Sequence, residues 1–504
     1  MLSPRNATWL VTTAFAAGIL PAAAGPPASV ELKSPAFTVV SDGGEKDARY
    51  VALQFEQVRA LLKQVWPWAR LDPSRPITIL AARDEGGLRQ LLPGFWEQKG
   101  RVHPAGIFVK APDRSWVAVR TDVARFREAD AQWDNPFLLV FHEYVHLVLH
   151  LNFSELPAWL DEGLADFWGN SIVEEKRVYI GYHIPYHLAT LRERGVLPLS
   201  RLFVVGHGSP EYSENNRVST FYAESWALVH YLAFGAGGPV GQRSQLNQLV
   251  GLLKAGAAPK DAHEQVFGDP AALTRAFEHY VSQQSFRYRR RDVALLSSGD
   301  SWTSRTLTAP EALALRAGFH AAMGRAAETR ALAGEALALD PNTAAAHEAL
   351  AVVAVRENKP DEALSSLARA VLLPDVSDYG QFLFGRLLWQ KAQDEASLET
   401  AERAFTRAVE MNTSYAEAYD ALASVMSARG APLAQCLPLA LRAAQLEPSI
   451  IEYSITAIRL AARGGGIDEA RQKTELLLAR ASAEDRPKLD ALLKELRAST
   501  DTSP

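Results

Sequence analysis

The stretch Val140-Phe-His-Glu-Tyr-Val-His146 contains two histidines four residues apart, with a glutamate directly after the first. Apolar residues surround it on both sides, which predicts a buried helix. On such a helix His142 and His146 share one face about one turn apart, so both imidazoles can bind one cation. Glu143 then projects to the side, where a carboxylate that does not bind the metal can take a proton from metal-bound water.

The alternative interpretation is a buried helix that carries these polar residues by coincidence. Because the chain has 12 histidines among 504 residues, about one such chain in fifty would contain the pattern by chance. Two histidines and a glutamate in so apolar a helix need partners, since unpaired buried polar groups cost several kcal/mol. A bound metal ion supplies those partners.

A tetrahedral catalytic zinc ion also needs a third protein ligand and an open position. The next segment, Leu156–Trp168, predicts a second helix in which Glu162 and Asp166 lie four residues apart on one face. We interpret Glu162 as the third ligand. We interpret Asp166 as the carboxylate that accepts the free N–H of a metal-bound histidine. The alternative for each residue is a solvated carboxylate on a helix surface.

These two segments together resemble the gluzincin zinc peptidases, in particular the peptidase-MA-like proteins of bacteria. That pattern is H-E-x-x-H followed by W-L-x-E-G-x-A, and this chain has H-E-Y-V-H and W-L-D-E-G-L-A. The resemblance implies His142, His146 and Glu162 as zinc ligands. It also implies Glu143 as the general base and a zincin-like fold.

A later helix, predicted for Phe221–Leu232, carries a candidate for another role. Hydrolysis through a tetrahedral intermediate needs a donor aimed at the developing oxyanion. Tyr222 is our candidate for that donor, with His207 and His230 behind it. The alternative is a core tyrosine on an amphipathic helix. The peptidase-MA-like proteins that the chain resembles carry a similar Y-A-x-S-W-A-L-V helix at this distance from the zinc motif.

Two other groups of polar residues have simpler interpretations. His183 and His187 repeat the spacing of the first histidine pair, but Pro185 between them disfavours a regular helix. We interpret them as structural histidines or as part of a substrate rim rather than as a second metal site. The run Arg287–Arg291 is interpreted as a solvated domain edge rather than an anion site.

Length and composition limit the class of protein. A chain of 504 residues exceeds what a single core usually supports, so we expect more than one domain. With 48% hydrophobic and 22% charged residues the chain is expected to be globular. Its net charge of −5 argues against nucleic acid as the main partner. The single cysteine, Cys436, leaves no intrachain disulfide.

Residues 1–24 have the pattern of a secretory signal peptide. Arg5 lies in a short charged start, an apolar stretch follows, and Ala22-Ala23-Ala24 fits a cleavage site. No later segment approaches the length of a membrane span. We therefore expect a soluble periplasmic or secreted protein with no stable membrane insertion.

Residues 30–292 are predicted to form the metallopeptidase domain, with a small mixed sheet before the histidine helix. Its strand-like runs are Phe37–Val40, Ile77–Leu80, and the two arms of a hairpin, Gly106–Lys110 and Trp116–Arg120. In the gluzincins that the chain resembles, the edge strand of the sheet binds extended substrate backbone. Our candidates for that strand are Ile107–Val109 and Val117–Val119.

The C-terminal part has a different pattern. Residues 293–308 are rich in Ser, Thr, Gly and Asp and are predicted to be a linker. Residues 309–498 are rich in Ala and Leu and repeat at about 34 residues, which matches the tetratricopeptide pattern. We expect three to five repeats and a terminal capping helix, Arg486–Arg497. The concave face of such an array usually holds a peptide or protein segment.

The predicted fold class is therefore α+β: a small mixed sheet with a helical zincin-like metallopeptidase domain, followed by an all-α tetratricopeptide-type solenoid. The first functional hypothesis is an exported Zn²⁺-dependent peptidase whose repeats recruit a peptide or protein substrate or a partner. The alternative is a periplasmic tetratricopeptide scaffold with a structural or inactive metal site. A third hypothesis is a zinc hydrolase acting on a non-peptide amide.

Overall fold

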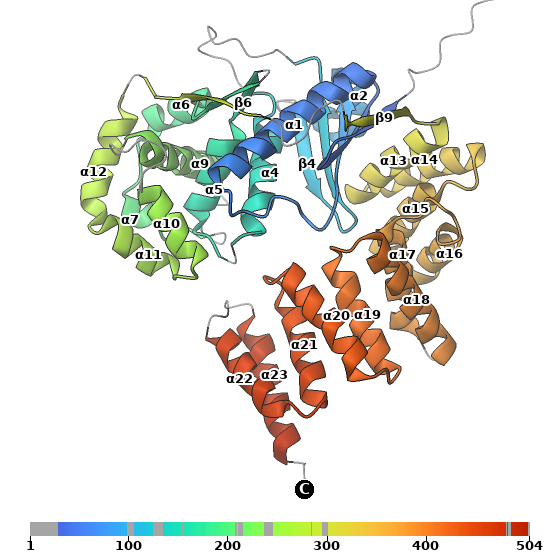
Figure 1. Cartoon of the computed structure of the whole chain (residues 1–504). Helices are drawn as coiled ribbons and strands as arrows, with labels where there is room; N and C mark the ends of the chain where they lie inside the picture. Colours follow the sequence, from blue (N-terminus) through green and yellow to red (C-terminus); the bar gives the residue numbers. More distant parts are fainter. Residues whose placement is uncertain are drawn as a thin grey trace, which may run out of the picture.

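The computed structural model divides the chain into an N-terminal domain (residues 29–294) and a helical array (residues 309–501), as Figure 1 shows. The structure describes residues 29–97, 105–123, 135–153, 155–174, 176–206, 209, 215–235, 245–283, 285–294, 301–392, 394–479, 481 and 485–501. The predicted signal peptide, residues 1–24, lies outside the described residues. Among those residues, no helix combines the length and the apolar character that crossing a membrane requires.

Six strands form one sheet. They are β1 (Val30–Lys33), β2 (Phe37–Ser41), β3 (Ile77–Ala82), β4 (Gly106–Lys110), β5 (Ser115–Arg120) and β9 (Thr303–Thr306), in the order β4-β5-β3-β2-β1-β9. The central neighbours β2, β3 and β5 are parallel, and the other pairings are antiparallel. Every residue of β3 is buried, as expected for a parallel strand covered on both faces. The predicted mixed sheet is thus present.

The outer strands of this sheet bear on two predictions. Strand β4 is at one edge, so the candidate segment Ile107–Val109 lies at the edge and Val117–Val119 lies inside the sheet. Residues 303–306, predicted to be part of a linker, instead form β9 at the other edge. Their sequence, Thr-Ser-Arg-Thr, has no apolar alternation. They form a strand because β1 offers unpaired backbone groups there, which the sequence pattern does not show.

Helices cover both faces of the sheet, and they come from both parts of the chain. Helix α1 (Glu45–Val65) packs over one face, where Val39 joins the main core. The neighbouring Val40 points to the opposite face, because side chains alternate along a strand. There it joins a second core with Phe319 of the helical array. The start of the array therefore covers this second face of the sheet.

Three helices form the centre of the second half of the N-terminal domain: α4 (Leu138–His150), α5 (Ala158–Gly169) and α9 (Asn215–His230). Helix α5 packs against both α4 and α9, and all of its 12 residues are buried. A methyl group at Gly163 would lie 2.4 Å from the backbone oxygen of Ser225, and one at Gly169 would lie 2.7 Å from the backbone nitrogen of His142. Glycine at these two positions lets the three helices approach closely.

Smaller elements complete the domain. Three strands, β6 (Ile172–Glu174), β7 (Arg177–Ile180) and β8 (Arg289–Asp292), form a second antiparallel sheet. Most of the Arg287–Arg291 run thus lies in an edge strand. The remaining helices are α2 (Glu85–Leu91), α3 (Gly94–Glu97), α6 (Pro185–Arg194), α7 (Leu199–Leu202), the π-helical turn η1 (Tyr231–Gly235), α10 (Gln245–Lys254), α11 (Pro259–Phe267) and α12 (Pro270–Val281).

The helical array consists of five described helix pairs and a terminal helix. They are α13 (Ala309–Ala322) with α14 (Ala326–Leu339), α15 (Ala344–Arg356) with α16 (Pro360–Ala370), α17 (Asp378–Lys391) with α18 (Glu395–Met411), α19 (Ala416–Ala428) with α20 (Leu433–Leu446), α21 (Ile451–Arg463) with α22 (Ile467–Leu478), and α23 (Arg486–Asp501). Buried alanines such as Ala333, Ala363 and Ala440 let the paired helices approach closely. The array agrees with the predicted solenoid of helix pairs.

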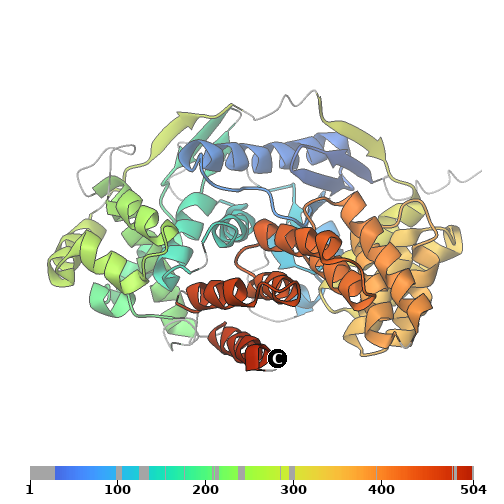
Figure 2. The same cartoon turned by 60° about the horizontal axis from the view of Figure 1, so that its bottom comes forward.

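The array curves around one side of the N-terminal domain. It starts beside α2 and the sheet, and its last helices lie below the domain in the view of Figure 1. Figure 2 shows the same array running across the lower part of the molecule. We call the face formed by the first helix of each pair, α13, α15, α17, α19 and α21, the inner face.

Candidate metal centre

Helices α4 and α5 bring three side chains to one point. The Nε2 atoms of His142 and His146 lie 3.0 Å apart, and each lies 3.2 Å from Oε2 of Glu162. All three residues are buried, with at most 8% of their surface exposed. The sequence predicted this group, because positions four apart on one helix share a face.

Each of the two histidines is fixed by a carboxylate on its other ring nitrogen. Asp166 Oδ1 lies 2.7 Å from Nδ1 of His142, and Asp161 Oδ1 lies 2.9 Å from Nδ1 of His146. An ionised carboxylate only accepts hydrogen bonds, so both Nδ1 atoms are the donors. This arrangement leaves the Nε2 lone pair of each neutral imidazole pointing into the shared space.

Three acceptor atoms therefore face one another, which is unfavourable unless a cation lies between them. In a tetrahedral zinc site with metal–ligand distances of about 2.0 to 2.1 Å, ligand atoms lie roughly 3.3 Å apart. The separations of 3.0 and 3.2 Å are close to that value. Two imidazole nitrogens and one carboxylate oxygen are also a donor set that zinc binds. The residues present thus fit a zinc ion.

Without a metal ion, protons must supply the positive charge. Burial alone would lower the pKa of His142, but the Asp166 and Glu162 carboxylates outweigh burial and raise this pKa to about 10. For His146, hydrogen bonds to Asp161 and Glu162 likewise outweigh burial and raise the pKa to about 9. This group of histidines and carboxylates is therefore arranged to attract positive charge, either as two protons or as a divalent cation.

Two further histidines bind the carboxylates behind the cluster. His187 Nε2 lies 2.7 Å from Oδ2 of Asp166, and His150 Nε2 lies 2.9 Å from Oδ2 of Asp161. Burial would raise the pKa of Asp166, but the neighbouring histidines outweigh it and hold this pKa well below its usual range. His187 is buried, whereas about half of the His150 side chain is exposed. Both carboxylates are thus charged and held in place.

Glu143 and Tyr222 lie beside this group, as predicted. Glu143 directly follows His142 on α4 and is half-buried. Among the described residues, its carboxylate has no hydrogen-bond or ion-pair partner. The hydroxyl of Tyr222, on α9, donates a hydrogen bond of 3.2 Å to Oε1 of Glu162. Its ring centre lies 6.3 Å from that of His142.

Of the six residues proposed from the sequence, the structure thus brings together His142, His146, Glu162, Asp166 and Tyr222, and Glu143 follows His142 on α4. The sequence interpretation missed Asp161 and gave His187 no place in the cluster. Asp161 is not four residues from a ligand, so the helical spacing that selected Asp166 passed over it. The available signal was a third acidic residue, beside Glu162 and Asp166, in an otherwise apolar helix, since a buried carboxylate needs a partner.

The other histidines considered from the sequence fall into separate groups. His230 is buried, with ring nitrogens 2.8 Å from the hydroxyl of Tyr280 and 2.8 Å from the backbone oxygen of Gly181. Both of its ring nitrogens are therefore occupied by partners other than the residues of the candidate metal centre. His207 lies outside the described residues. His183 stacks on Tyr182 with ring centres 4.7 Å apart.

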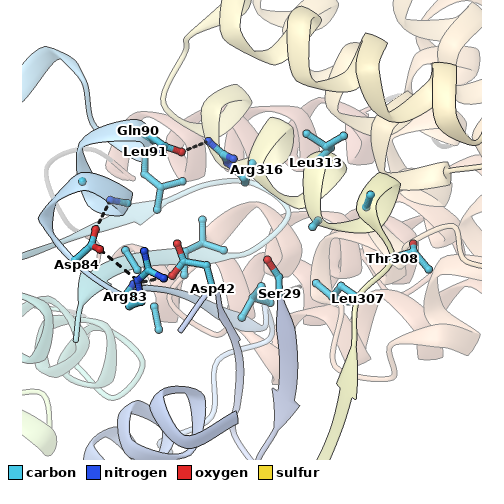
Figure 3. Close-up of a pocket in the computed structure, with 18 residues that line it drawn as sticks. Ser29, Asp42, Arg83, Asp84, Gln90, Leu91, Leu307, Thr308, Leu313 and Arg316 are labelled. Carbon is cyan, nitrogen blue, oxygen red and sulfur yellow. Dashed lines mark hydrogen bonds and ion pairs between the residues drawn. The ribbon is translucent and has the colours of Figure 1, made fainter. Parts of the chain in front are cut away.

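A separate pocket lies between the N-terminal domain and the array. Figure 3 shows this pocket, which has a volume of about 590 Å³ and a mostly apolar lining from β2, β3, α2 and α13. At its edge, the backbone nitrogen of Arg83 donates to Oδ1 of Asp42 over 2.6 Å. Arg316 and Gln90 form a hydrogen bond across it. None of the residues of the candidate metal centre lines this pocket.

Comparisons with known proteins give limited information. No protein-family model matches the chain, and no curated protein matches it. Among solved structures, the MamA protein is 20% identical over 36% of this chain and 94% of that chain, with a TM-score of 0.30. YrrB, described as a TPR protein with an unusual peptide-binding site, is 18% identical over 36% of this chain and 90% of its own, with a TM-score of 0.32. Yeast Tom70 is 13% identical over 76% of this chain and 67% of its own, with a TM-score of 0.33. At these low scores, the description of the array rests on this chain's own helix pairs.

Proposed function

We propose that this protein is a zinc-dependent peptidase whose reaction centre is the cluster of His142, His146 and Glu162. The observation that supports the proposal most strongly is the meeting of three acceptor atoms, 3.0 to 3.2 Å apart, with each histidine held by a buried carboxylate. Two histidines and one carboxylate are a ligand set of hydrolytic zinc enzymes. The resemblance of the sequence motif to that of gluzincin peptidases supports the same assignment.

Each side chain has a role in this proposal. His142, His146 and Glu162 would hold the zinc ion, which when bound acidifies a coordinated water and polarises the scissile carbonyl. Glu143, whose carboxylate is unpaired among the described residues, takes a proton from the attacking water and delivers it to the leaving amine.

Tyr222 is proposed as a donor to the developing oxyanion. Its hydroxyl already lies beside the ligand Glu162. Asp161 and Asp166 act through the histidines and are positioning residues.

Strand β4 supports a peptide as the substrate. It is the edge of the six-stranded sheet and lies against α4, because a methyl group at Gly106 would lie 2.9 Å from Cγ1 of Val140. The free backbone groups of an edge strand can bind an extended peptide as an additional strand. A peptide bound along Ile107–Val109 would therefore run beside the helix that carries both histidine ligands.

The experiment is metal analysis of the purified full chain, followed by a peptide-library cleavage screen. We expect about one zinc ion per chain and cleavage that is lost in Glu143→Gln while zinc stays bound. The matched control is Glu155→Gln, since Glu155 is an exposed carboxylate between α4 and α5. Zinc binding without cleavage of any library peptide would contradict the proposal. That outcome would favour the alternative, a scaffold with a structural or inactive metal site.

A further inference from the structure

The loop between α1 and β3, residues 70–76, lies against the inner face of the helical array (Figure 1). Its sequence is Arg-Leu-Asp-Pro-Ser-Arg-Pro. The side chain of Asn412, at the end of α18, donates to the backbone oxygen of Ser74 over 3.1 Å. The hydroxyl of Ser74 bonds to Glu447, and Arg70 donates to the backbone oxygen of Leu446. The array thus binds this loop through its main chain as well as its side chains.

Arg75 is the centre of the contact. Its guanidinium lies 4.0 Å from the ring centre of Tyr415 and 5.8 Å from that of Tyr379. Its Nη2 donates to Oε2 of Glu417 over 2.9 Å, and about 20% of its side chain is exposed. A planar guanidinium can stack on a ring and bind a carboxylate at the same time. This is the geometry by which arginine, rather than lysine, is recognised.

Charge and backbone rigidity favour the same contact. The array side presents Asp378, Glu417 and Glu447, with Arg386 3.8 Å from Glu417. The loop presents Arg70 and Arg75, while its one acidic residue, Asp72, pairs with Arg59 of α1. The loop also contains two prolines, which fix the backbone and lower the entropy lost on docking.

We propose that the inner face contains an arginine-binding pocket, formed by Tyr379, Tyr415 and Glu417, and that its ligand is Arg75 of the same chain. Recruitment of a peptide at this position would then have to displace the loop. A competing peptide would have to present an arginine in a short extended segment. The proposal does not depend on zinc or on peptidase activity.

The docked loop also contacts the end of the histidine helix. The backbone nitrogen of Arg70 donates to Oδ1 of Asn152 over 2.8 Å, and Nδ2 of Asn152 donates to the backbone oxygen of Arg70 over 2.7 Å. Asn152 lies two residues after α4 and also donates to the backbone oxygen of Val148. The loop therefore connects the array to the C-terminal end of α4, and the pocket is expected to hold that end in place.

The test is amide hydrogen exchange on the full-length protein, followed in peptides that cover residues 66–80 and 138–153. Arg75→Glu and Glu417→Arg, made singly, are expected to speed exchange in the first segment at least about tenfold and to speed it also at the end of α4. The double variant rebuilds the ion pair with reversed charges but not the stacking on Tyr415, so it is expected to restore part of that change. Unchanged exchange in the single variants, or no restoration in the double variant, would overturn the proposal.

Two further variants test specificity. Arg330 and Glu357 form an ion pair of 2.6 Å within the array. Reversing this pair is expected to leave exchange in residues 66–80 unchanged. Arg75→Lys keeps the charge and folds with the least disturbance, but it lacks the planar fork, so we expect an intermediate rise in exchange. Exchange equal to that of the wild-type chain in Arg75→Lys would refute an arginine-specific pocket.

Discussion

Carboxylates are buried in both parts of the molecule, but their partners differ. At the metal cluster, burial would raise the pKa of Asp161, yet hydrogen bonds from His146 and His150 outweigh it and lower this pKa to about 2. In the array, Glu348 on α15 accepts hydrogen bonds from the backbone nitrogen and hydroxyl of Ser377. These neutral donors do not offset burial, which raises the pKa of Glu348 to about 7. Partners that carry charge, rather than depth of burial, decide whether a buried acid stays ionised.

The two parts also bury different side chains. Helix α5 buries three acidic residues together with aromatic rings, whereas the array buries mainly alanine and leucine. The first arrangement costs desolvation energy, which a bound cation would offset. The second stabilises helix packing and carries no chemistry. The N-terminal domain and the array are therefore expected to respond differently to substitution.

The largest difference between the two parts is expected when a proposed zinc ligand is removed from the N-terminal domain. Glu162→Ala deletes one of three ligand atoms and leaves two imidazoles without the carboxylate, so we expect zinc content to fall from about one ion per chain to background. Atomic absorption on dialysed protein measures this. Glu155→Ala, at an exposed site, is the control and is expected to retain its zinc. Full zinc content in Glu162→Ala would remove this residue from the ligand set.

A core substitution in the array is expected to lower the stability of the fold without changing zinc binding. Leu367 on α16 is fully buried, and Leu367→Ala leaves a cavity, so we expect a loss of about 2 to 5 kcal/mol in the free energy of unfolding. Denaturant titration measures the loss, and zinc affinity is expected to stay unchanged. Leu372→Ala, with 83% of the wild-type residue exposed, is the matched control. Weaker zinc binding in Leu367→Ala would show that packing inside the array also supports the proposed zinc ligands.

Removing a positioning carboxylate is expected to have a smaller effect than removing a ligand. Asp161→Asn keeps the size of the side chain but removes the charge that holds Nδ1 of His146. We expect zinc affinity to fall about 10- to 100-fold, as for other carboxylates that orient a histidine ligand. Competition with a chelator measures this affinity. Asp261→Asn, exposed on α11, should bind zinc as the wild-type chain does. Equal affinity in both variants would deny Asp161 this role.

The smallest expected effect concerns the pH dependence of stability. In the folded state the pKa of Glu348 is raised above its ordinary value of 4.5. The protonated carboxyl group therefore contributes stability below pH 4.5, and this contribution is lost as the pH rises through about 7. The Glu348→Gln variant cannot ionise here and does not show this loss. Its free energy of unfolding relative to that of the wild-type chain should therefore rise by about 1 to 2 kcal/mol between pH 5 and pH 8. Unfolding titrations at four pH values measure the trend. The exposed Glu335→Gln should show no such trend.

The sequence predicted those parts of the molecule that depend on spacing within one element. His142 and His146 are four residues apart, as are Glu162 and Asp166, and a helix converts that interval into a shared face. The same reasoning predicted β2, β3 and the β4–β5 hairpin close to their observed bounds. The solenoid was predicted from its repeat of about 34 residues.

Contacts between distant elements could not be read from spacing. The parallel order of β2, β3 and β5 depends on how α1 and α2 cross the sheet, and no single strand records it. The bond between His187 and Asp166 joins helices α6 and α5, which strands β6 and β7 separate in the sequence. The docking of Arg75 joins residues more than three hundred positions apart. Only the folded chain defines such pairs.

Strand β9 has a consequence for how the protein is made and shortened. Since β1 pairs on one side with residues 303–306, its outer backbone groups stay open until the whole N-terminal domain (residues 29–294) has left the ribosome. A protein truncated at residue 292, just after β8, would keep that open edge permanently, and such edges promote self-association. Expression of the domain alone is therefore expected to yield soluble material only when the chain extends past Thr306.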